Sequence, residues 1–343
     1  MKDFDIAYEH DSARVPVRGR QYLAGSTSVE VPESIPMAND MVLALRAATH
    51  NWTLDEAAHR CRAAIDEALY DRGAILFRAL PLNDRKDFDA FMRALGYAPS
   101  NYSGGIAVRR HDAGYALMAS QEDPRISMAP HNEMAYLPGY PRKVFFCCAA
   151  EGTAGGEVPI NDIRLSVAHI PTDVLDTFRQ KGIRYYRSLP QANDAQQIGW
   201  METFGVERRE DVEMIMRDKG YDFTWRGDGR LSYSYAMPAF VAHPDTGEAL
   251  WFNQVTELHC SYWRDHPHFP SDLADDEYPA TTRYGDGSPI PDALIVRLRA
   301  ALWKPARAVK MRKGDVLALD NQVIQHGRIA FEGPRQHLVS ITA

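Results

Sequence analysis

Residues 131–133 read His-Asn-Glu, which places an imidazole and a carboxylate two positions apart. A second triplet of this H-x-[DE] form occupies residues 243–245. In a chain with 12 His and 46 acidic residues, chance alone gives about 1.6 such triplets. The number of triplets is therefore no argument for a metal site, and their surroundings must separate them.

The two triplets lie in different contexts. Residues 243–248 read HPDTGE, where Pro, Asp and Gly suit a tight reversal, so Asp245 is predicted to be a turn residue. His131 and Glu133 come just before an apolar run that begins at Val144. This position favours a pair of metal ligands on the inner face of a strand system, with a polar turn as the alternative.

A third ligand has to come from a distant segment. Two His and one carboxylate on one face of iron(II) leave adjacent positions open, as in non-haem oxygenases. His326, within DVLALDNQVIQHGR, is the candidate, and Arg335 follows it. An Arg there can present a planar two-donor fork to a carboxylate of a dianionic co-substrate. Taken singly, His326 could equally be a core histidine and Arg335 a surface residue in an ion pair.

The elements that would position these residues are helical first and strand-rich later. Residues 53–73 open with a Thr53-x-x-Glu56 capping box, repeat apolar residues at helical spacing and stop at Gly73. Residues 74–80 read as a buried strand, and residues 86–96 as a second helix with Phe88 on its apolar face.

From residue 144 onward, short apolar or alternating runs alternate with Gly, Pro and Asp, which is typical of antiparallel strands. Helical patterns interrupt these runs at 173–182, 209–220 and 291–303. We therefore predict one α+β domain over residues 1–343, with an irregular N-terminal arm at 1–45 and a helical insert at about 165–225.

Composition excludes several classes of protein. A net charge of −7 disfavours a general nucleic-acid binder, which needs a basic face. No apolar stretch approaches the roughly 20 residues that span a bilayer, and the N-terminus lacks a signal-peptide pattern. The four cysteines show no C-x-x-C spacing, so we predict free, buried thiols in a cytoplasmic protein.

The order of motifs resembles that of a known family. HNE at 131–133, GGE at 155–157, HPDTGEALWFNQ at 243–254, DNQVIQHGR at 320–328 and GPR at 333–335 are similar to the iron(II)/2-oxoglutarate dioxygenases of the taurine dioxygenase (TauD/TfdA) type. The likeness is greatest to the branch of syringomycin-type amino-acid hydroxylases. It runs from about residue 70 to the C-terminus and is more specific for the cofactors than for the substrate.

The resemblance implies a double-stranded β-helix, or jelly roll, with the metal near one mouth. His131, Glu133 and His326 would be the iron ligands, and Arg335 would hold the far carboxylate of 2-oxoglutarate. The reaction would use O2, release succinate and CO2, and hydroxylate an unactivated carbon. Glu133 argues against halogenation, because chlorinating relatives have a small residue in place of the carboxylate.

Two positions depart from the family pattern. Val158 follows GGE where many relatives have a Thr that helps to bind 2-oxoglutarate. Val339 stands four residues after Arg335, where taurine dioxygenase has a second Arg for the sulfonate. The first departure leaves one accessory hydrogen bond in doubt, and the second argues against taurine as the substrate.

Substrate contacts are the least determined part of the prediction. Trp251 and Asn253 could share a face toward the site, or belong to the core and a strand edge. Arg109, in a glycine loop, could close over an anionic group or be solvated. Arg328, two residues after His326, would point to the ligand's face if its strand is regular. Residues 259–270, rich in His and aromatic residues, read as a lid or surface loop.

The predicted function is hydroxylation of an amino acid or amino-acid-derived metabolite, free or held on a carrier protein. Desaturation or cyclisation would use the same cofactors, and the sequence does not separate these outcomes. A cupin-like protein that binds metal without turnover is an alternative from another class, as is a structural module without metal.

Overall fold

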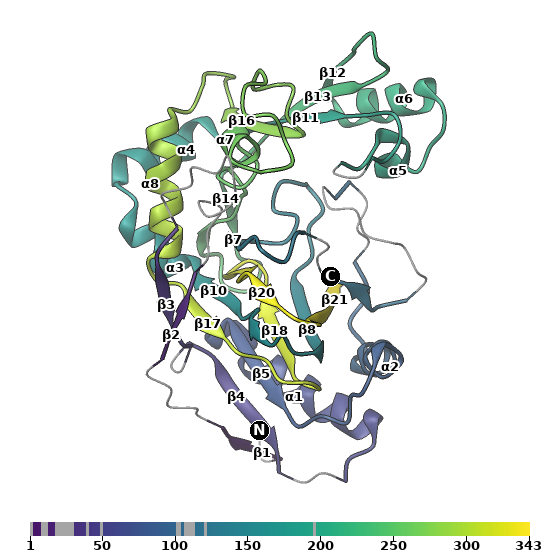
Figure 1. Ribbon diagram of the computed structural model, residues 1–343, viewed down its shortest axis with the longest axis vertical. Helices are drawn as coiled ribbons and strands as arrows, with labels where there is room; N and C mark the ends of the chain where they lie inside the picture. Colours follow the sequence, from purple (N-terminus) through teal and green to yellow (C-terminus); the bar gives the residue numbers. More distant parts are fainter. Residues whose placement is uncertain are drawn as a thin grey trace.

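The structure is a computed structural model that describes residues 3–7, 13–17, 31–38, 41–48, 51–100, 104–105, 114–119, 122–194 and 197–343. It contains two facing sheets, a third sheet above them and helices on the outside (Figure 1).

Seven strands form the larger sheet. In spatial order they are β1 (Phe4–Ile6), β4 (Leu43–Ala47), β5 (Ala74–Arg78), β18 (Val316–Asp320), β8 (Lys143–Ala150), β21 (Gln336–Thr342) and β6 (Leu117–Met118). The β4–β5 pair is parallel and the other pairs are antiparallel.

The two faces of the larger sheet bury different cores, because side chains alternate along each strand. On the outer face, Cys147 packs in a cluster with helices α1 (Leu54–Arg72) and α2 (Arg85–Leu95). On the inner face, Cys148 and Phe146 belong to the main core. Both helices confirm the sequence prediction: the Thr53–Glu56 capping box is formed and Phe88 is buried.

The smaller sheet supplies the other half of the main core. It consists of β17 (Arg307–Val309), β10 (Val158–Asp162), β19 (Ile324–Arg328) and β7 (Met128–His131), in that order. The two sheets meet where the ring centroids of Phe146 and His326 lie 4.9 Å apart. The carboxyl end of β7 and the middle of β19 therefore face the inner side of the larger sheet.

A third sheet occupies the opposite end of the molecule from α1 and α2 (Figure 1). Its strands, in order, are β12 (Asp222–Trp225), β13 (Leu231–Met237), β11 (Ile183–Leu189) and β16 (Ala280–Tyr284). The helices beside it include α4 (Thr172–Lys181), α5 (Trp200–Phe204), α6 (Arg209–Lys219) and α8 (Asp292–Trp303). Three of these helices match the predicted patterns.

The predicted helical insert is only partly helical. Strand β11 runs through the middle of the 165–225 segment and pairs with β13 and β16 on both sides. Its sequence IRYYRSL lacks clean alternation because Arg and Tyr side chains occur on both faces of the strand.

The prediction of an irregular N-terminal arm at residues 1–45 is wrong for the described part of that segment. Strands β1 and β4 extend the larger sheet, and β2 (Arg14–Pro16) pairs with β3 (Ser34–Pro36). These strands have three to five residues, which is too short for a period to show, and they are ordered by backbone pairing with neighbours that are distant in sequence.

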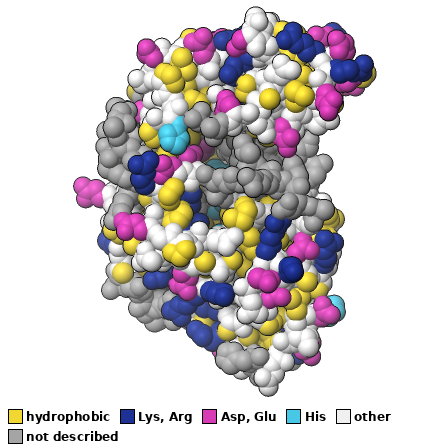
Figure 2. All heavy atoms as spheres, turned by 45° about the vertical axis from the view of Figure 1, so that its right-hand side comes forward, with side chains coloured by type: hydrophobic (Ala, Val, Ile, Leu, Met, Phe, Trp, Pro, Cys, Tyr) yellow, Lys and Arg dark blue, Asp and Glu magenta, His cyan; other side chains and the backbone are white. Residues whose placement is uncertain are grey.

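The remaining elements are short. They are β9 (Ala154–Gly155), β20 (Phe331–Glu332), β14 (Phe240–Ala242), β15 (Ala249–Trp251), α3 (Ile163–Ser166), a 3-10 turn (Val167–His169) and α7 (Cys260–Arg264). None of the helices in the described ranges has the length and hydropathy needed to cross a bilayer. Acidic and basic side chains lie interspersed over the face in Figure 2.

Candidate metal centre

Three predicted ligands converge at the junction of β7 and β19. His131, the last residue of β7, is the cross-strand partner of His326 on β19, and their ring centroids lie 4.8 Å apart. Glu133 follows in the turn after β7, with its Oε2 at 3.5 Å from His326 Nε2. One donor atom from each residue lies within 4.8 Å of the others. Two imidazoles and one carboxylate so arranged fit an iron(II) site with open positions.

The ring of His131 is oriented for coordination. Its Nδ1 lies 2.9 Å from the carbonyl oxygen of Ala129, so Nδ1 carries the proton and Nε2 presents its lone pair. Burial lowers the pKa of His131, the ring of His326 lowers it further, and Glu133 and Glu257 oppose the shift. A lowered pKa favours the neutral imidazole that a metal requires.

The side chain of Asn321 holds the ligand turn in place. Its Oδ1 accepts a hydrogen bond from Glu133 N at 2.7 Å, and its Nδ2 donates to Glu133 O at 2.9 Å and Pro141 O at 2.7 Å. Its backbone carbonyl accepts from Asn132 Nδ2 at 2.6 Å. Asn321 was not among the predicted site residues, although it lies within the DNQVIQHGR motif. Asn321 links the segment before β19 to the turn that carries Glu133.

Two backbone features bring the strands close together. Gly327 follows His326, and a Cβ there would lie 2.3 Å from the carbonyl oxygen of Met128 on β7. Met134, directly after Glu133, has φ +57°, a left-handed conformation that L residues adopt at a cost. The hydrogen bonds of Asn321 on either side of this residue stabilise the turn in that conformation.

The Arg335 side chain is half-buried beside the same core. Its Nε donates to Gly156 O at 2.7 Å, and its Nη2 lies 2.9 Å from His337 Nδ1. Gly156 has φ +83°, and a Cβ there would lie 2.6 Å from Arg335 Cδ. The second glycine of the GGE motif therefore makes room for the Arg335 side chain, which explains why the two motifs occur together.

Arg335 lies directly before β21, a strand of the larger sheet whose inner face is opposite His326. His337 pairs with Cys148 on β8, and Val339 pairs with Phe146, whose ring contacts His326. Burial lowers the pKa of Arg335 to about 10, with Arg328 adding to the shift. Burial also holds the pKa of His337 well below its usual value, so His337 adds no second charge. No carboxylate among the described residues lies within 4.0 Å of the Arg335 guanidinium, which leaves it suited to an anionic ligand.

The predicted substrate residues lie in different surroundings. Arg109 falls outside the described residues. Trp251 is buried between Phe178 and Phe240, with ring centroids at 5.1 and 5.3 Å. Asn253 donates to Ala239 O at 3.0 Å and accepts from Val255 N at 3.1 Å. Their observed contacts are those of a core Trp and a turn-forming Asn, and a substrate role for either stays a prediction.

Arg328 is engaged with the backbone. Its guanidinium donates to the carbonyl oxygens of Glu122, Asp123 and Ile126 at 2.9, 2.5 and 2.9 Å. The pairing of β19 with β7 shifts register between His326 and Arg328, so the regular alternation that the prediction assumed does not hold there. In this structure Arg328 anchors the 122–126 segment.

The structure also tests the predictions for the HPDTGE and 259–270 segments. Residues 243–247 form the predicted turn, closed by a hydrogen bond from Gly247 N to His243 O at 2.7 Å. Residues 259–270 were predicted to be a lid or surface loop; the surface-loop alternative is wrong for His266, which is buried with its Nε2 at 3.2 Å from Glu122 Oε1, and the lid alternative stays a prediction. The partner comes from a segment more than a hundred residues earlier, so no local pattern showed it.

The segment after β15 reaches toward the metal ligands. Gln254 Nε2 donates to Asn132 O at 2.5 Å, and Gln254 N donates to the Tyr185 hydroxyl on β11 at 3.2 Å. Glu257, three residues later, is buried. Glu257 was not among the predicted site residues, because an acidic residue in a turn carries no local signal of burial.

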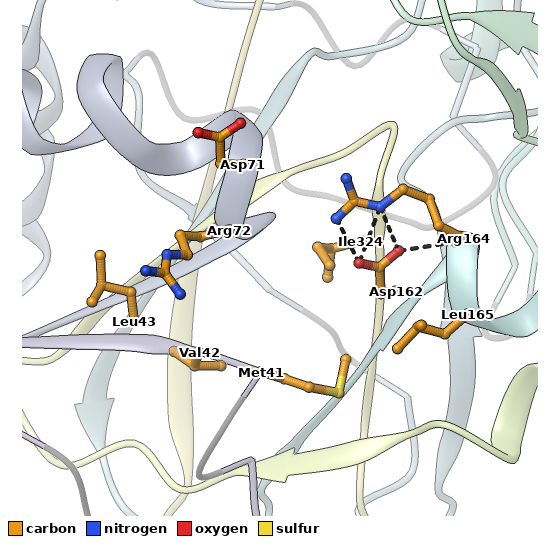
Figure 3. Close-up of a pocket in the computed structure, with 9 residues that line it drawn as sticks. All are labelled: Met41, Val42, Leu43, Asp71, Arg72, Asp162, Arg164, Leu165 and Ile324. Carbon is orange, nitrogen blue, oxygen red and sulfur yellow. Dashed lines mark hydrogen bonds and ion pairs between the residues drawn. The ribbon is translucent and has the colours of Figure 1, made fainter.

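A surface pocket of about 230 Å³ lies elsewhere in the structure (Figure 3). Asp71 and Arg72, at the end of α1, line one side, and Asp162 and Arg164 form an ion pair with a 2.6 Å contact on the other. None of the three candidate ligands lines this pocket. Its paired charges and exposed position distinguish it from the metal centre.

Comparisons with known proteins agree with the geometry. A family model described as "Taurine catabolism dioxygenase TauD, TfdA family" matches residues 39–342. Dapdiamide synthesis protein DdaC of Enterobacter agglomerans is 30% identical over 298 residues, covering 86% of this chain and 89% of that protein. A clavaminate synthase-like protein of Arabidopsis thaliana is 28% identical over 315 residues, covering 90% and 92%. The crystal structure of PvcB from Pseudomonas aeruginosa, at 14% identity, covers 98% of this chain and 94% of its own with a TM-score of 0.50, which shows a shared fold.

Proposed function

This chain belongs to the TauD, TfdA family of dioxygenases, and we propose that it hydroxylates an unactivated carbon of an amino acid or amino-acid-derived metabolite. It is an oxidoreductase that uses iron(II) and 2-oxoglutarate. When bound, these two cofactors supply the oxygen chemistry, and the protein supplies position, access and polarity. The convergence of His131, Glu133 and His326 is the observation that carries the proposal.

The chain's own residues have distinct tasks in this proposal. His131, Glu133 and His326 hold iron, and the Ala129 carbonyl keeps the proton of His131 on Nδ1. The three ligands would occupy one face of the ion, which would leave the other positions for 2-oxoglutarate and O2 next to the substrate.

Arg335 binds the distal carboxylate of 2-oxoglutarate in our proposal. Two of its nitrogens are held by Gly156 O and His337 Nδ1, which fixes the guanidinium before the anion arrives. Val158, in place of the Thr found in many relatives, is buried and pairs with Val309. Arg335 would therefore bind the co-substrate without a hydroxyl from that position.

The substrate class rests on the family and on one relative. The name of DdaC places that protein in dapdiamide synthesis, and the sequence resemblance is greatest to amino-acid hydroxylases. We propose an amino acid or its derivative, free or held on a carrier protein, as the substrate of this chain. Desaturation or cyclisation would need the same site, and no observed contact favours either over hydroxylation.

We propose that the two facing sheets form a double-stranded β-helix within a single domain that spans the chain. Their shared core, closed by the Phe146–His326 contact, supports this description. All four cysteines are free and buried, which fits the predicted cytoplasmic location, where thiols stay reduced.

The test is an anaerobic titration of the protein with iron(II) and then 2-oxoglutarate, following the visible charge-transfer band of the chelate. Wild type should develop the band. Arg335→Ala should need about 100-fold more 2-oxoglutarate, because a charge-assisted bidentate pair is lost. Arg335→Lys should recover part of the affinity. A wild-type protein without the band would overturn the proposed cofactor site.

A further inference from the structure

A buried carboxylate outside the ligand set lies close to the metal centre. Glu257 is 9% exposed, in the turn between β15 and α7. Its Oε1 accepts a hydrogen bond from the Thr256 hydroxyl at 2.6 Å. Its Oε2 is buried and has no hydrogen-bond partner among the described residues. A buried carboxylate oxygen in this state carries a large desolvation cost unless a ligand satisfies it.

The turn that carries Glu257 is fixed against the ligand strand. Gln254 Nε2 donates to the carbonyl oxygen of Asn132, the residue between His131 and Glu133. Gln254 N donates to the Tyr185 hydroxyl, and Thr282 Oγ1 donates to Val255 O at 2.8 Å. The position of Glu257 relative to the metal ligands is thus set by hydrogen bonds on both sides of the turn.

Electrostatic coupling supports the same proximity. Burial raises the pKa of Glu257, and the Thr256 hydroxyl and the charge of His131 oppose that shift. Burial also raises the pKa of Tyr185, whose hydroxyl holds this turn, and the charge of Glu257 adds to that shift. Glu257 therefore lies within electrostatic range of both His131 on the ligand strand and Tyr185 on the third sheet.

Three ordinary roles do not fit Glu257. It is not part of the group of donor atoms formed by His131, Glu133 and His326. It does not orient the ring of His131, because the Ala129 carbonyl oxygen already accepts the hydrogen bond from His131 Nδ1–H. It forms no ion pair within 4.0 Å among the described residues, and Arg299 beside it donates to Thr256 O and to Ser261 Oγ.

We propose that Glu257 binds the ammonium group of the substrate and so positions the neighbouring carbon at the metal. This inference rests on the proposed function and narrows it to substrates with a free primary amine. An ammonium group can donate to Oε2, satisfies a buried carboxylate by charge and hydrogen bonding, and itself requires an anionic partner when removed from water. A carrier-bound aminoacyl group fits as well as a free amino acid, because both keep the amine.

The experiment compares amines with their acetylated counterparts. The probes are the common L-amino acids and their N-acetylcysteamine thioesters, each with and without N-acetylation. They are added anaerobically to the protein loaded with iron(II) and 2-oxoglutarate, and the shift of the chelate band gives an apparent Kd. In wild type we expect at least one free amine to shift the band while its acetylated form does not. Glu257→Gln should raise the apparent Kd for that amine by about 10- to 100-fold.

Controls separate recognition from folding. Glu257→Gln is isosteric and should keep the unperturbed chelate band and its thermal unfolding temperature, and Glu257→Asp should retain part of the affinity because the charge remains. Glu207→Gln removes an exposed carboxylate and should change neither the band nor the affinity.

Each contrary outcome has a separate meaning. Acetylated probes that bind as well as amines, a Glu257→Gln protein with wild-type affinity, or a panel in which no amine shifts the wild-type band would overturn the role of Glu257. Absence of the chelate band itself would count against the proposed function instead.

Discussion

The ligand strands and the third sheet build opposite sides of the site in different ways. On the ligand side, backbone carbonyls and the Asn321 amide fix β7, the Glu133 turn and β19 through short hydrogen bonds. On the other side, Tyr235 on β13 stacks on Tyr221, which directly precedes β12, with ring centroids 4.4 Å apart. The first arrangement fixes donor atoms through hydrogen bonds, whereas the second packs aromatic rings against one another.

The two sides also differ in how they accommodate buried ionisable groups. On the ligand side a metal ion satisfies the buried donors His131, Glu133 and His326 when it binds. On the side of the 253–260 turn, Glu257 and His259 are buried and do not belong to the candidate ligand group. In our proposals the ligand side binds the cofactors, Glu257 in the turn binds the substrate amine, and the buried His259 adds a pH response.

The largest expected effect is on the ligand side. His326→Ala removes the only ligand contributed by β19 and should weaken iron(II) binding by more than about 100-fold, beyond the 10- to 100-fold typical of an outer partner. Anaerobic iron titration measures this loss, and EDTA treatment of wild type should reproduce the absence of the chelate band. His59→Ala, at an exposed position of α1, serves as the control. If His326→Ala bound iron(II) as tightly as wild type, the assignment of His326 as a metal ligand would be wrong.

Asn321→Ala should have the next largest effect. It removes three hydrogen bonds that hold Glu133 and Pro141 and leaves buried backbone groups without partners, for a loss of about 2–4 kcal/mol in the free energy of unfolding. Iron affinity should fall by about 10- to 100-fold because the Glu133 turn is less well fixed. Urea denaturation and iron titration measure the two effects. A stable variant with normal iron affinity would show that strand pairing alone positions the ligands, and Asn51→Ala is the exposed control.

The smallest effect is on the pH response of the substrate side. Burial lowers the pKa of His259 to about 4, with Arg299 adding to the shift. Between pH 4 and 6.5, position 259 therefore binds more protons in the unfolded chain than in the folded one. As the pH drops below 6.5, this difference lowers the free energy of unfolding, by about 2 kcal/mol at pH 5. His259→Asn keeps a side chain that can cap α7 and should reduce the loss of stability between pH 7 and pH 5. Urea denaturation at both pH values measures it, with His59→Asn as the control; an unaltered loss would contradict the assignment.

Local signals in the sequence determined much of the ligand side. The Thr53–Glu56 capping box, the buried strand at 74–78 and the alternation that separates Cys147 from Cys148 are all present in the structure. The residue types at His131, Glu133, His326 and Arg335 were compatible with iron and a dianionic co-substrate, and the order of the motifs, through its resemblance to the TauD/TfdA family, made that assignment specific. Short-range patterns and coordination preferences need no knowledge of distant contacts.

Tertiary structure alone decided the rest. Asn321 matters because its amide meets a turn 188 residues earlier in the chain, and Gly156 matters because Arg335 passes across its Cα. The burial of Glu257 likewise depends on the packing of Gln254, Tyr185 and Thr282 around its turn. Such roles arise from contacts between segments far apart in sequence, and the local pattern around each residue is the same whether or not that contact forms.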